Sequence, residues 1–217
     1  MITAKNIHYS YDNLKVLKGI DLNIKKGEFV CIIGASGTGK TTLLQILGTL
    51  EKIQRGTLEI NNKNTNKLSD QEISKLRNQE IGFVFQFHNL LNEFTALENI
   101  CLPAYLYRNT SVETIKQKAL EILKMLNIQH RDNHKTDELS GGEQQRIAVA
   151  RALINSPSII LADEPSGNLD SKNATELHHL LLKLNKEKNQ TIVVTTHNKD
   201  LAKLSDRILE ISDGKII

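Results

Sequence analysis

Short runs of apolar residues separated by polar turns dominate the first part of the chain and are typical of β-strands. The pattern predicts strands at residues 2–9, 20–24, 28–33, 57–60 and 81–85, with helices at 39–48 and 69–78. The run at 28–33 is almost wholly apolar, as in strands that are buried on both faces. A glycine-rich turn follows it directly, so the sequence changes there from a strand to a helix.

The middle of the chain has helical spacing instead. Helices are predicted at 97–106, interrupted at Pro103, and at 112–126. A second alternation follows, with helices at 141–154 and 171–186, strands at 159–162 and 191–195, and a final short helix and strand. This order predicts an α/β fold with a mostly parallel sheet covered by helices on both faces. The helical stretch 95–127 interrupts the alternation and is expected to form a lobe of its own.

Composition and charge fit one globular domain. The chain has 217 residues, of which 28 are basic and 25 acidic, which gives a formal charge of +3. Both signs are interspersed without a dense basic stripe, so we expect no nucleic-acid partner. Cys31 and Cys101 lie in apolar surroundings and are expected to be buried thiols of a reducing compartment. The longest apolar run, 29–33, is too short for a signal peptide or a membrane span, so we expect membrane contact only through a partner.

The turn after the strand at 28–33 carries a phosphate-binding pattern. Residues 34–41 match G-x-x-x-x-G-K-[ST] between an apolar strand and a helix. The glycines leave N–H groups free to surround a polyphosphate at the helix N-terminus, where the helix dipole also favours negative charge. Lys40 is expected to reach the β- and γ-phosphates, and Thr41 to ligate Mg²⁺. The residues expected to contact ATP here are Gly34, Ala35, Ser36, Gly37, Thr38, Gly39, Lys40, Thr41 and Thr42.

Two acidic residues, Asp163 and Glu164, end the apolar strand at 159–162. Ligands of open α/β sheets bind at the carboxyl ends of the strands, so both carboxylates are expected near the phosphates. Neighbouring residues of a strand point in different directions. This predicts Asp163 in the Mg²⁺ shell and Glu164 as the residue that orients or deprotonates the attacking water.

A second helix start, at Ser140, has similar features. Ser140 and Glu143 form an S-x-x-E capping box, and Gly141 and Gly142 place no bulky side chain over the first N–H groups. One interpretation is a well-capped structural helix. The other is a second anion site, which implies a dimer in which each copy covers its partner's nucleotide, since one ATP can hardly occupy two helix N-termini of a monomer.

Together these motifs resemble the nucleotide-binding domains of ABC transporters, and the resemblance extends over residues 2–217. It implies a P-loop NTPase fold with an N-terminal antiparallel β subdomain, a core at about 1–86 and 156–217, and an inserted helical lobe at about 87–155. It also implies ATP and Mg²⁺ as cofactors and a homodimer of ATPase subunits.

The resemblance also implies roles for individual residues. The implied catalytic residues are Glu164, His197, Lys40 and Gln86, and the implied metal ligands are Thr41, Gln86 and Asp163. The residues implied to contact the partner's nucleotide are Ser140, Gly141, Gly142, Glu143 and Asp170, the last of them in a D-loop at 166–170. Tyr11 is implied to stack on adenine, with Tyr9 as the nearby alternative.

Within the family, residues 86–99 are most similar to the MacB/Lol/FtsE group and above all to its lipoprotein-releasing ATPases. This implies two integral membrane subunits and a peripheral location at the cytoplasmic face of the inner membrane. Efflux and cell-division complexes are the alternatives. Three residues depart from the pattern, because Asn92 and Thr136 stand where prolines are common and Ser166 replaces a commoner threonine.

Two further features concern surfaces. The apolar residues between 87 and 97 either pack into the lobe or line a groove for a partner's helix; they are Phe87, Leu90, Leu91, Phe94 and Leu97. His178 and His179, on the predicted helix at 171–186, are interpreted as surface histidines without a role.

Two other functional classes fit less well. A soluble mechanical ATPase acting on DNA or ribosomes would be expected to carry a long coiled coil or two fused ATPase domains. A nucleoside kinase would explain the phosphate-binding loop but would leave residues 139–146 unexplained.

Overall fold

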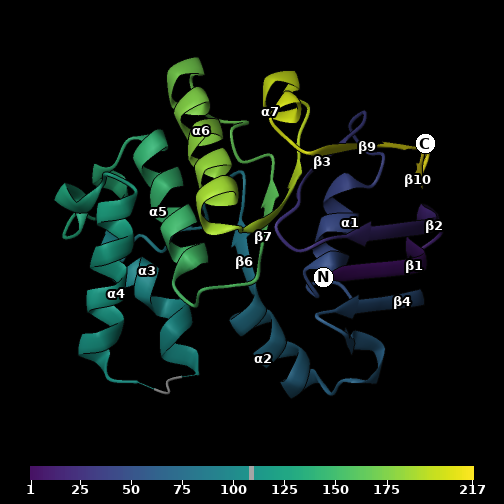
Figure 1. Cartoon of the computed structure of the whole chain (residues 1–217), viewed down its shortest axis with the longest axis horizontal. Helices are drawn as coiled ribbons and strands as arrows, with labels where there is room; N and C mark the ends of the chain where they lie inside the picture. Colours follow the sequence, from purple (N-terminus) through teal and green to yellow (C-terminus); the bar gives the residue numbers. More distant parts are fainter. Residues whose placement is uncertain (108–109) are drawn as a thin grey trace.

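A computed structural model describes residues 1–107 and 110–217 and contains two β-sheets and a group of helices beside them (Figure 1). The smaller sheet has the strand order β2-β1-β4-β5 and is antiparallel. The larger sheet has the order β10-β9-β3-β8-β7-β6. Its strands from β9 to β6 are parallel, and β10 pairs with β9 in the antiparallel direction. The α/β fold and the antiparallel N-terminal sheet expected from the sequence are confirmed.

The element bounds follow the predicted pattern, except that β2 begins at Leu14, well before the predicted strand at 20–24. The strands are β1 (Ile2–Tyr11), β2 (Leu14–Ile24), β3 (Phe29–Ile33), β4 (Arg55–Ile60), β5 (Lys63–Asn64), β6 (Ile81–Val84), β7 (Ile159–Asp163), β8 (Thr191–Thr195), β9 (Arg207–Ser212) and β10 (Lys215–Ile216). The α-helices are α1 (Lys40–Leu47), α2 (Asp70–Glu80), α3 (Ala96–Leu106), α4 (Val112–Met125), α5 (Gly141–Leu153), α6 (Ser171–Lys188) and α7 (Lys199–Lys203). Short 3₁₀ turns lie at Thr65–Lys67, Gln129–Arg131 and Thr136–Glu138. The two-residue strands β5 and β10 are not among the predicted ones.

Strand β3 lies between two buried cores. Phe29 and Cys31 face a cluster formed with helices α3 to α7, whereas Val30 and Ile32 face a second cluster that includes α1 and the smaller sheet. Helix α1 lies between the two sheets (Figure 1). Because both faces of β3 are covered, its sequence is apolar without alternation. Cys31 and Cys101 are buried free thiols, as expected.

Helix α3 continues through Pro103, and the predicted interruption is therefore wrong. Proline lacks an N–H group and disfavours a helix interior. Here the side-chain amides of Asn78 and Asn155 donate hydrogen bonds to the carbonyl oxygen of Pro103, at 2.9 and 3.3 Å. Contacts from α2 and from the segment after α5 thus hold the last turn of α3, and they outweigh the preference of proline for positions outside a helix interior.

Helix α5 approaches β6 closely because β6 contains Gly82. A Cβ atom at Gly82 would lie 2.5 Å from the carbonyl oxygen of Ala152. Helix α5 also packs against α3 and α4, so it joins the helical lobe to the larger sheet. The division into a core and a lobe with boundaries at 87 and 155 therefore stays a prediction, since α5 contacts both parts.

Replacing Gly82 with alanine is expected to lower the free energy of unfolding by about 1–3 kcal/mol, because the added Cβ must displace the backbone of α5. Urea titration of the folded chain measures the change. Gly141→Ala is the matched control, since a Cβ there meets only Leu169 Cδ2 at 3.8 Å. Equal unfolding midpoints for the two variants would contradict the prediction.

Candidate functional site

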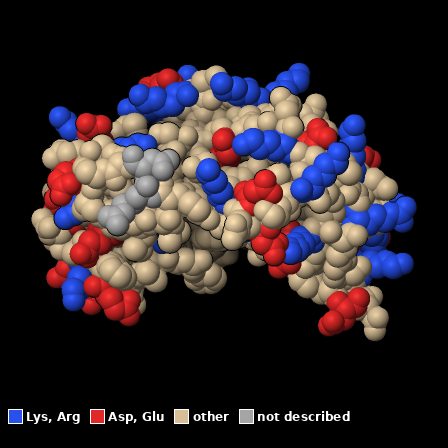
Figure 2. All heavy atoms as spheres, turned by 90° about the horizontal axis from the view of Figure 1, so that it is seen from below, with Lys and Arg blue, Asp and Glu red and all other residues tan. Residues whose placement is uncertain are grey.

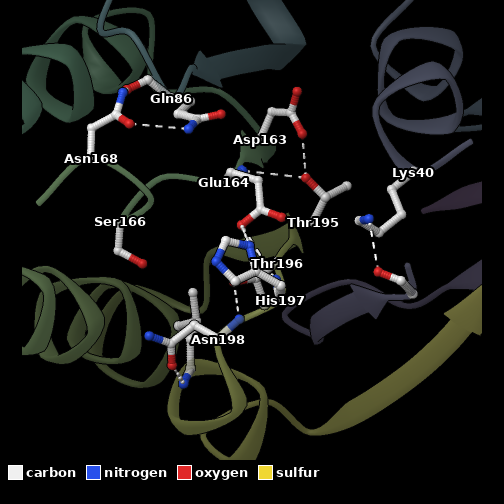
Figure 3. A network of polar contacts seen from close by, with 12 residues as sticks. Lys40, Gln86, Asp163, Glu164, Ser166, Asn168, Thr195, Thr196, His197 and Asn198 are labelled. Atoms are coloured by element: carbon white, nitrogen blue, oxygen red, sulfur yellow. Dashed lines mark hydrogen bonds and ion pairs between the residues drawn. The ribbon is translucent and has the colours of Figure 1, made fainter. Parts of the chain in front are cut away.

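Four neighbouring parallel strands, β3, β8, β7 and β6, end at the same edge of the larger sheet. The glycine-rich loop follows β3, Gln86 follows β6, Asp163 ends β7 with Glu164 next to it, and His197 follows β8. Strand order and direction therefore bring together residues that are far apart in the sequence (Figure 3). This is the edge at which open α/β sheets bind ligands.

The loop at 34–39 has a conformation that requires glycine. Gly34 has a φ of +151°, and a Cβ there would lie 2.3 Å from the carbonyl oxygen of Ile211. Gly39 is the N-cap of α1 with a φ of +103°, and in the described part of the chain no side chain caps this helix start. The first N–H groups of α1 and the positive end of its dipole thus lie beside the loop, which suits an anion.

The side chain of Lys40 folds back over this loop. Its Nζ atom donates hydrogen bonds to the carbonyl oxygens of Gly34 and Ala35, both at 2.9 Å (Figure 3). Thr38 Oγ1 also donates to the Ala35 carbonyl, at 2.9 Å. The loop is therefore closed on itself, with an ammonium group at its centre.

Asp163 joins three elements. Its Oδ1 atom accepts a hydrogen bond from Thr41 Oγ1 at 3.1 Å and a second one from Thr195 Oγ1. Thr195 was predicted as part of a strand but not as a site residue; a threonine in place of an aliphatic residue at the end of a buried strand is the signal that could have found it. A carboxylate with hydroxyl oxygens beside it is a donor set of the kind that Mg²⁺ prefers.

Glu164 and His197 form a pair. Glu164 Oε2 lies 2.9 Å from His197 Nδ1 and accepts the His197 backbone N–H at 3.3 Å. The Glu164 side chain is 17% exposed and that of His197 is 73% exposed, so the histidine lies on the solvent side. Glu164 has a φ of +43°, a left-handed conformation that non-glycine residues rarely adopt, and its N–H donates to the Thr195 carbonyl at 3.0 Å.

Gln86 contacts the D-loop. Its Nε2 atom donates to Asn168 Oδ1, and Asn168 Nδ2 donates to the Gln86 carbonyl, both at 3.2 Å. The hydrogen bonds found among the described residues do not link Gln86 to Asp163, although the resemblance implied that both bind metal. The contact between Asn168 and Gln86 was not predicted from the sequence.

The start of α5 has the predicted capping box. Ser140 Oγ accepts the Glu143 N–H at 3.4 Å, and Glu143 Oε2 accepts the Ser140 N–H at 2.8 Å. Arg131, which the sequence analysis missed, forms an ion pair with Glu143 at 2.7 Å. Burial opposes ionisation of Glu143, but the Ser140 N–H and the Arg131 guanidinium outweigh it and bring the pKa of Glu143 from 4.5 to about 2.

Asp170 caps the next helix, α6. Its Oδ1 atom accepts the N–H groups of Lys172 and Asn173, both at 3.0 Å, and the Asn173 N–H is the main reason why the pKa of Asp170 is lowered. Asn173 in turn packs on Gly142, where a Cβ would lie 2.2 Å from Asn173 Oδ1. Asn173 therefore bridges the end of the D-loop and the start of α5.

Tyr9 and Tyr11 differ in exposure. Tyr9 is buried, and its hydroxyl donates to Glu51 Oε2 at 2.6 Å, a hydrogen bond that raises the pKa of Tyr9 to about 12. Tyr11 is 44% exposed and meets Tyr9 edge to face, with ring centroids 5.0 Å apart. Of the two alternatives for adenine stacking, Tyr11 is thus the one with an accessible ring.

Each of the three departures from the family pattern has a hydrogen-bond partner. His178 is buried, and its Nε2 lies 2.9 Å from the hydroxyl of Ser166. The interpretation of His178 as a surface histidine is therefore wrong, while His179 is exposed as predicted. Thr136 Oγ1 donates to Asn92 Oδ1 at 2.7 Å, so the two residues that replace prolines pair with each other.

The apolar segment after Gln86 is only partly covered. Leu90 and Leu97 pack against the core, but Phe87 is 73% exposed and Leu91 is 45% exposed. Phe94 is half-buried. Packing into the lobe is thus confirmed for Leu90 and Leu97, whereas a groove for a partner's helix stays a prediction.

Beside this segment lies a groove of about 410 Å³ between α2, β6 and the end of α3. Arg77, Asn89, Leu106, Tyr107 and Arg151 are among the residues that line it. Arg151 donates to the carbonyl oxygens of His88 and Asn89, at 2.6 and 2.5 Å, and so holds two residues with left-handed backbones. One wall of the groove is therefore fixed by α5.

Charged side chains do not form a single-sign surface on the face seen in Figure 2, where basic and acidic residues are interspersed. Within residues 1–107 and 110–217, no helix is both long enough and apolar enough to span a membrane.

Comparison with known proteins gives consistent matches. A family model described as ABC transporter matches residues 17–167. The lipoprotein-releasing system ATP-binding protein LolD of Bacteroides fragilis is 52% identical over 217 residues, which is 100% of both chains.

Solved structures agree with this. The dimeric structure of the ABC transporter cassette MJ0796, a protein of Methanocaldococcus jannaschii, is 48% identical and superimposes with a TM-score of 0.92, over 100% of this chain and 96% of that one. A dimeric post-hydrolysis state of MJ0796 bound to ADP and Pi gives a TM-score of 0.91 at 47% identity, with the same coverage.

The lowered pKa of Glu143 makes stability depend on pH in the acid range. Between about pH 4.5 and 2 the unfolded chain takes up a proton at Glu143 that the folded chain does not, so stability falls as the pH falls through this window. Glu143→Gln is expected to lose less stability over that window than the unchanged chain, as measured by urea unfolding at several pH values. Parallel pH profiles for the two proteins would contradict this.

Proposed function

The chain belongs to the ABC transporter family, and we propose that this ATPase drives the release of lipoproteins from the inner membrane toward the outer membrane. The observation that carries the proposal is the 52% identity, over the full length of both chains, to a lipoprotein-releasing system ATP-binding protein. The match spans the segment at 86–99, to which the sequence analysis attached the same substrate class.

In the proposed reaction, two copies of the chain enclose two ATP molecules. The loop at 34–42 holds the phosphates through its N–H groups and Lys40, and Tyr11 stacks on adenine. The partner copy covers the nucleotide with the start of its α5 and the end of its D-loop, namely Ser140, Gly141, Gly142, Glu143 and Asp170. The dimeric structures of MJ0796 support this arrangement.

Glu164 is proposed to orient the attacking water and accept its proton, and His197 to hold the Glu164 carboxylate in place. The distance of 2.9 Å between Glu164 Oε2 and His197 Nδ1 supports this pairing. The left-handed backbone conformation of Glu164 is strained, and such strain is common at functional sites that need a side chain in one fixed direction.

Mg²⁺ fits the oxygen donors at the end of β7. Thr41, Asp163 and, after leaving Asn168, Gln86 would hold it, and when bound it would neutralise charge that develops on the phosphates. In the described structure Asp163 and Thr41 already lie 3.1 Å apart, so their side chains need little rearrangement.

We propose that each copy of the ATPase lies at the cytoplasmic face of the inner membrane and receives one of two integral membrane subunits at the groove next to residues 87–91. The exposed side chains of Phe87 and Leu91, together with the 410 Å³ groove, support this surface as the docking site. Contact with the membrane would then be made through these partners.

Glu164→Gln is expected to lower the turnover of ATP by roughly 100-fold or more, because the amide cannot accept the proton of the attacking water. Dimerisation in the presence of ATP should remain. Phosphate release and size-exclusion chromatography with ATP measure the two properties, and Glu187→Gln on the exposed side of α6 is the control. Undiminished hydrolysis in the Glu164 variant would remove it from the proposed role.

The substrate is tested by affinity purification of the full chain from detergent-solubilised native membranes, followed by mass spectrometry. We expect two related membrane subunits together with lipid-modified proteins. A double change of Phe87 and Leu91 to serine should abolish this recovery while ATP hydrolysis continues. Recovery of an efflux or cell-division subunit alone would contradict lipoproteins as the proposed substrate. Recovery of ribosomes or DNA without any membrane subunit would contradict the proposed transport function.

A further inference from the structure

One buried polar contact near the site has no place in the reaction described so far. His178 on α6 is 5% exposed and Ser166 in the D-loop is 8% exposed, and His178 Nε2 lies 2.9 Å from Ser166 Oγ. Leu177 and Leu181, its neighbours on α6, belong to the core, so the histidine is held by a packed helix. Two buried side chains from different elements are thus joined by a hydrogen bond.

Ser166 lies within a turn that begins at Glu164. The Gly167 N–H donates to the Glu164 carbonyl at 3.0 Å, which closes a four-residue turn with Pro165 in the second position and Ser166 in the third. A displacement of Ser166 would rotate the peptide units of this turn. Glu164 would move with them, because its backbone is the first member of the turn.

The same turn also reaches Gln86. A Cβ at Gly167 would lie 3.0 Å from Gln86 Nε2, and the next residue, Asn168, exchanges two hydrogen bonds with Gln86. The position of Ser166 therefore affects the direction of Glu164 on one side and the partner of Gln86 on the other.

The chemistry of the pair suits a fixed contact. A buried hydroxyl without a hydrogen-bond partner is unfavourable, and the imidazole satisfies it. Burial lowers the pKa of His178, which favours the neutral ring. A neutral imidazole has one donor and one acceptor nitrogen, and a serine hydroxyl can match either.

We propose that His178 is a positioning residue for ATP hydrolysis, which fixes Ser166 and thereby the turn that carries Glu164. This inference rests on the proposed role of Glu164. In this proposal His178 acts through Ser166 and makes no contact of its own with the nucleotide, so its removal should slow the chemical step without weakening the binding of ATP.

The experiment is a double-mutant cycle with His178→Phe, Ser166→Ala and the double variant, in the full chain. We expect each single change to lower kcat by about five- to tenfold, as for the loss of one buried hydrogen bond, with the KM for ATP within about twofold of the unchanged chain. The double variant should be no slower than either single variant, because both remove the same contact. His179→Phe, the exposed neighbour on α6, is the control and should keep full activity.

Thermal unfolding of each variant separates a loss of folding from a loss of positioning. Should His178→Phe fail to fold, Ser166→Ala and His178→Gln provide the test, since glutamine keeps a donor and an acceptor and should recover part of kcat. Full activity of folded His178→Phe or Ser166→Ala beside an active unchanged chain would overturn this inference alone, as would single effects that multiply in the double variant. Undiminished hydrolysis in Glu164→Gln would overturn the proposed role of Glu164 and this inference with it.

Discussion

The carboxylate of Asp163 joins the three elements on which the site depends. It accepts hydrogen bonds from Thr41 at the start of α1 and from Thr195 at the end of β8, while its own backbone ends β7. These contacts fix the glycine-rich loop relative to the two central strands. Glu164, the next residue, then has little freedom, because its N–H is bound to the Thr195 carbonyl and its side chain to His197. A carboxylate is well suited to this position, since its oxygens accept several hydrogen bonds from different directions.

A second set of polar contacts surrounds the D-loop and connects the helical side of the molecule to the sheet. Asn168 contacts Gln86, Ser166 contacts His178, and Asp170 caps α6 through Asn173, which packs on Gly142 at the start of α5. These contacts connect α5 and the segment at Gln86 to the residues next to Glu164. The start of α5 is thus joined to the D-loop by side-chain contacts in addition to the packing of α5 on the sheet.

Features that depend on neighbouring residues or on the order of strands and helices could be predicted from the sequence, and individual contacts between distant side chains could not. The phosphate-binding loop, the capping box at Ser140 and the apolar strands are local patterns, and the order of strands and helices placed Asp163, Glu164 and His197 at one sheet edge. The continuation of α3 through Pro103 depends on Asn78 and Asn155, and the burial of His178 depends on Ser166. Arg131 and Arg151 were missed for the same reason, because their partners lie at least 12 positions away.

The pairing of Ser166 with His178, and of Asn92 with Thr136, also limits how this sequence can change over generations. A substitution at one member alone leaves a polar group of the other without its partner, so the two positions of a pair are expected to drift together. Recombination between relatives meets the same limit. A crossover between the D-loop and α6, or between residues 92 and 136, would combine halves that were selected with different neighbours, and the safest exchange points lie outside both pairs.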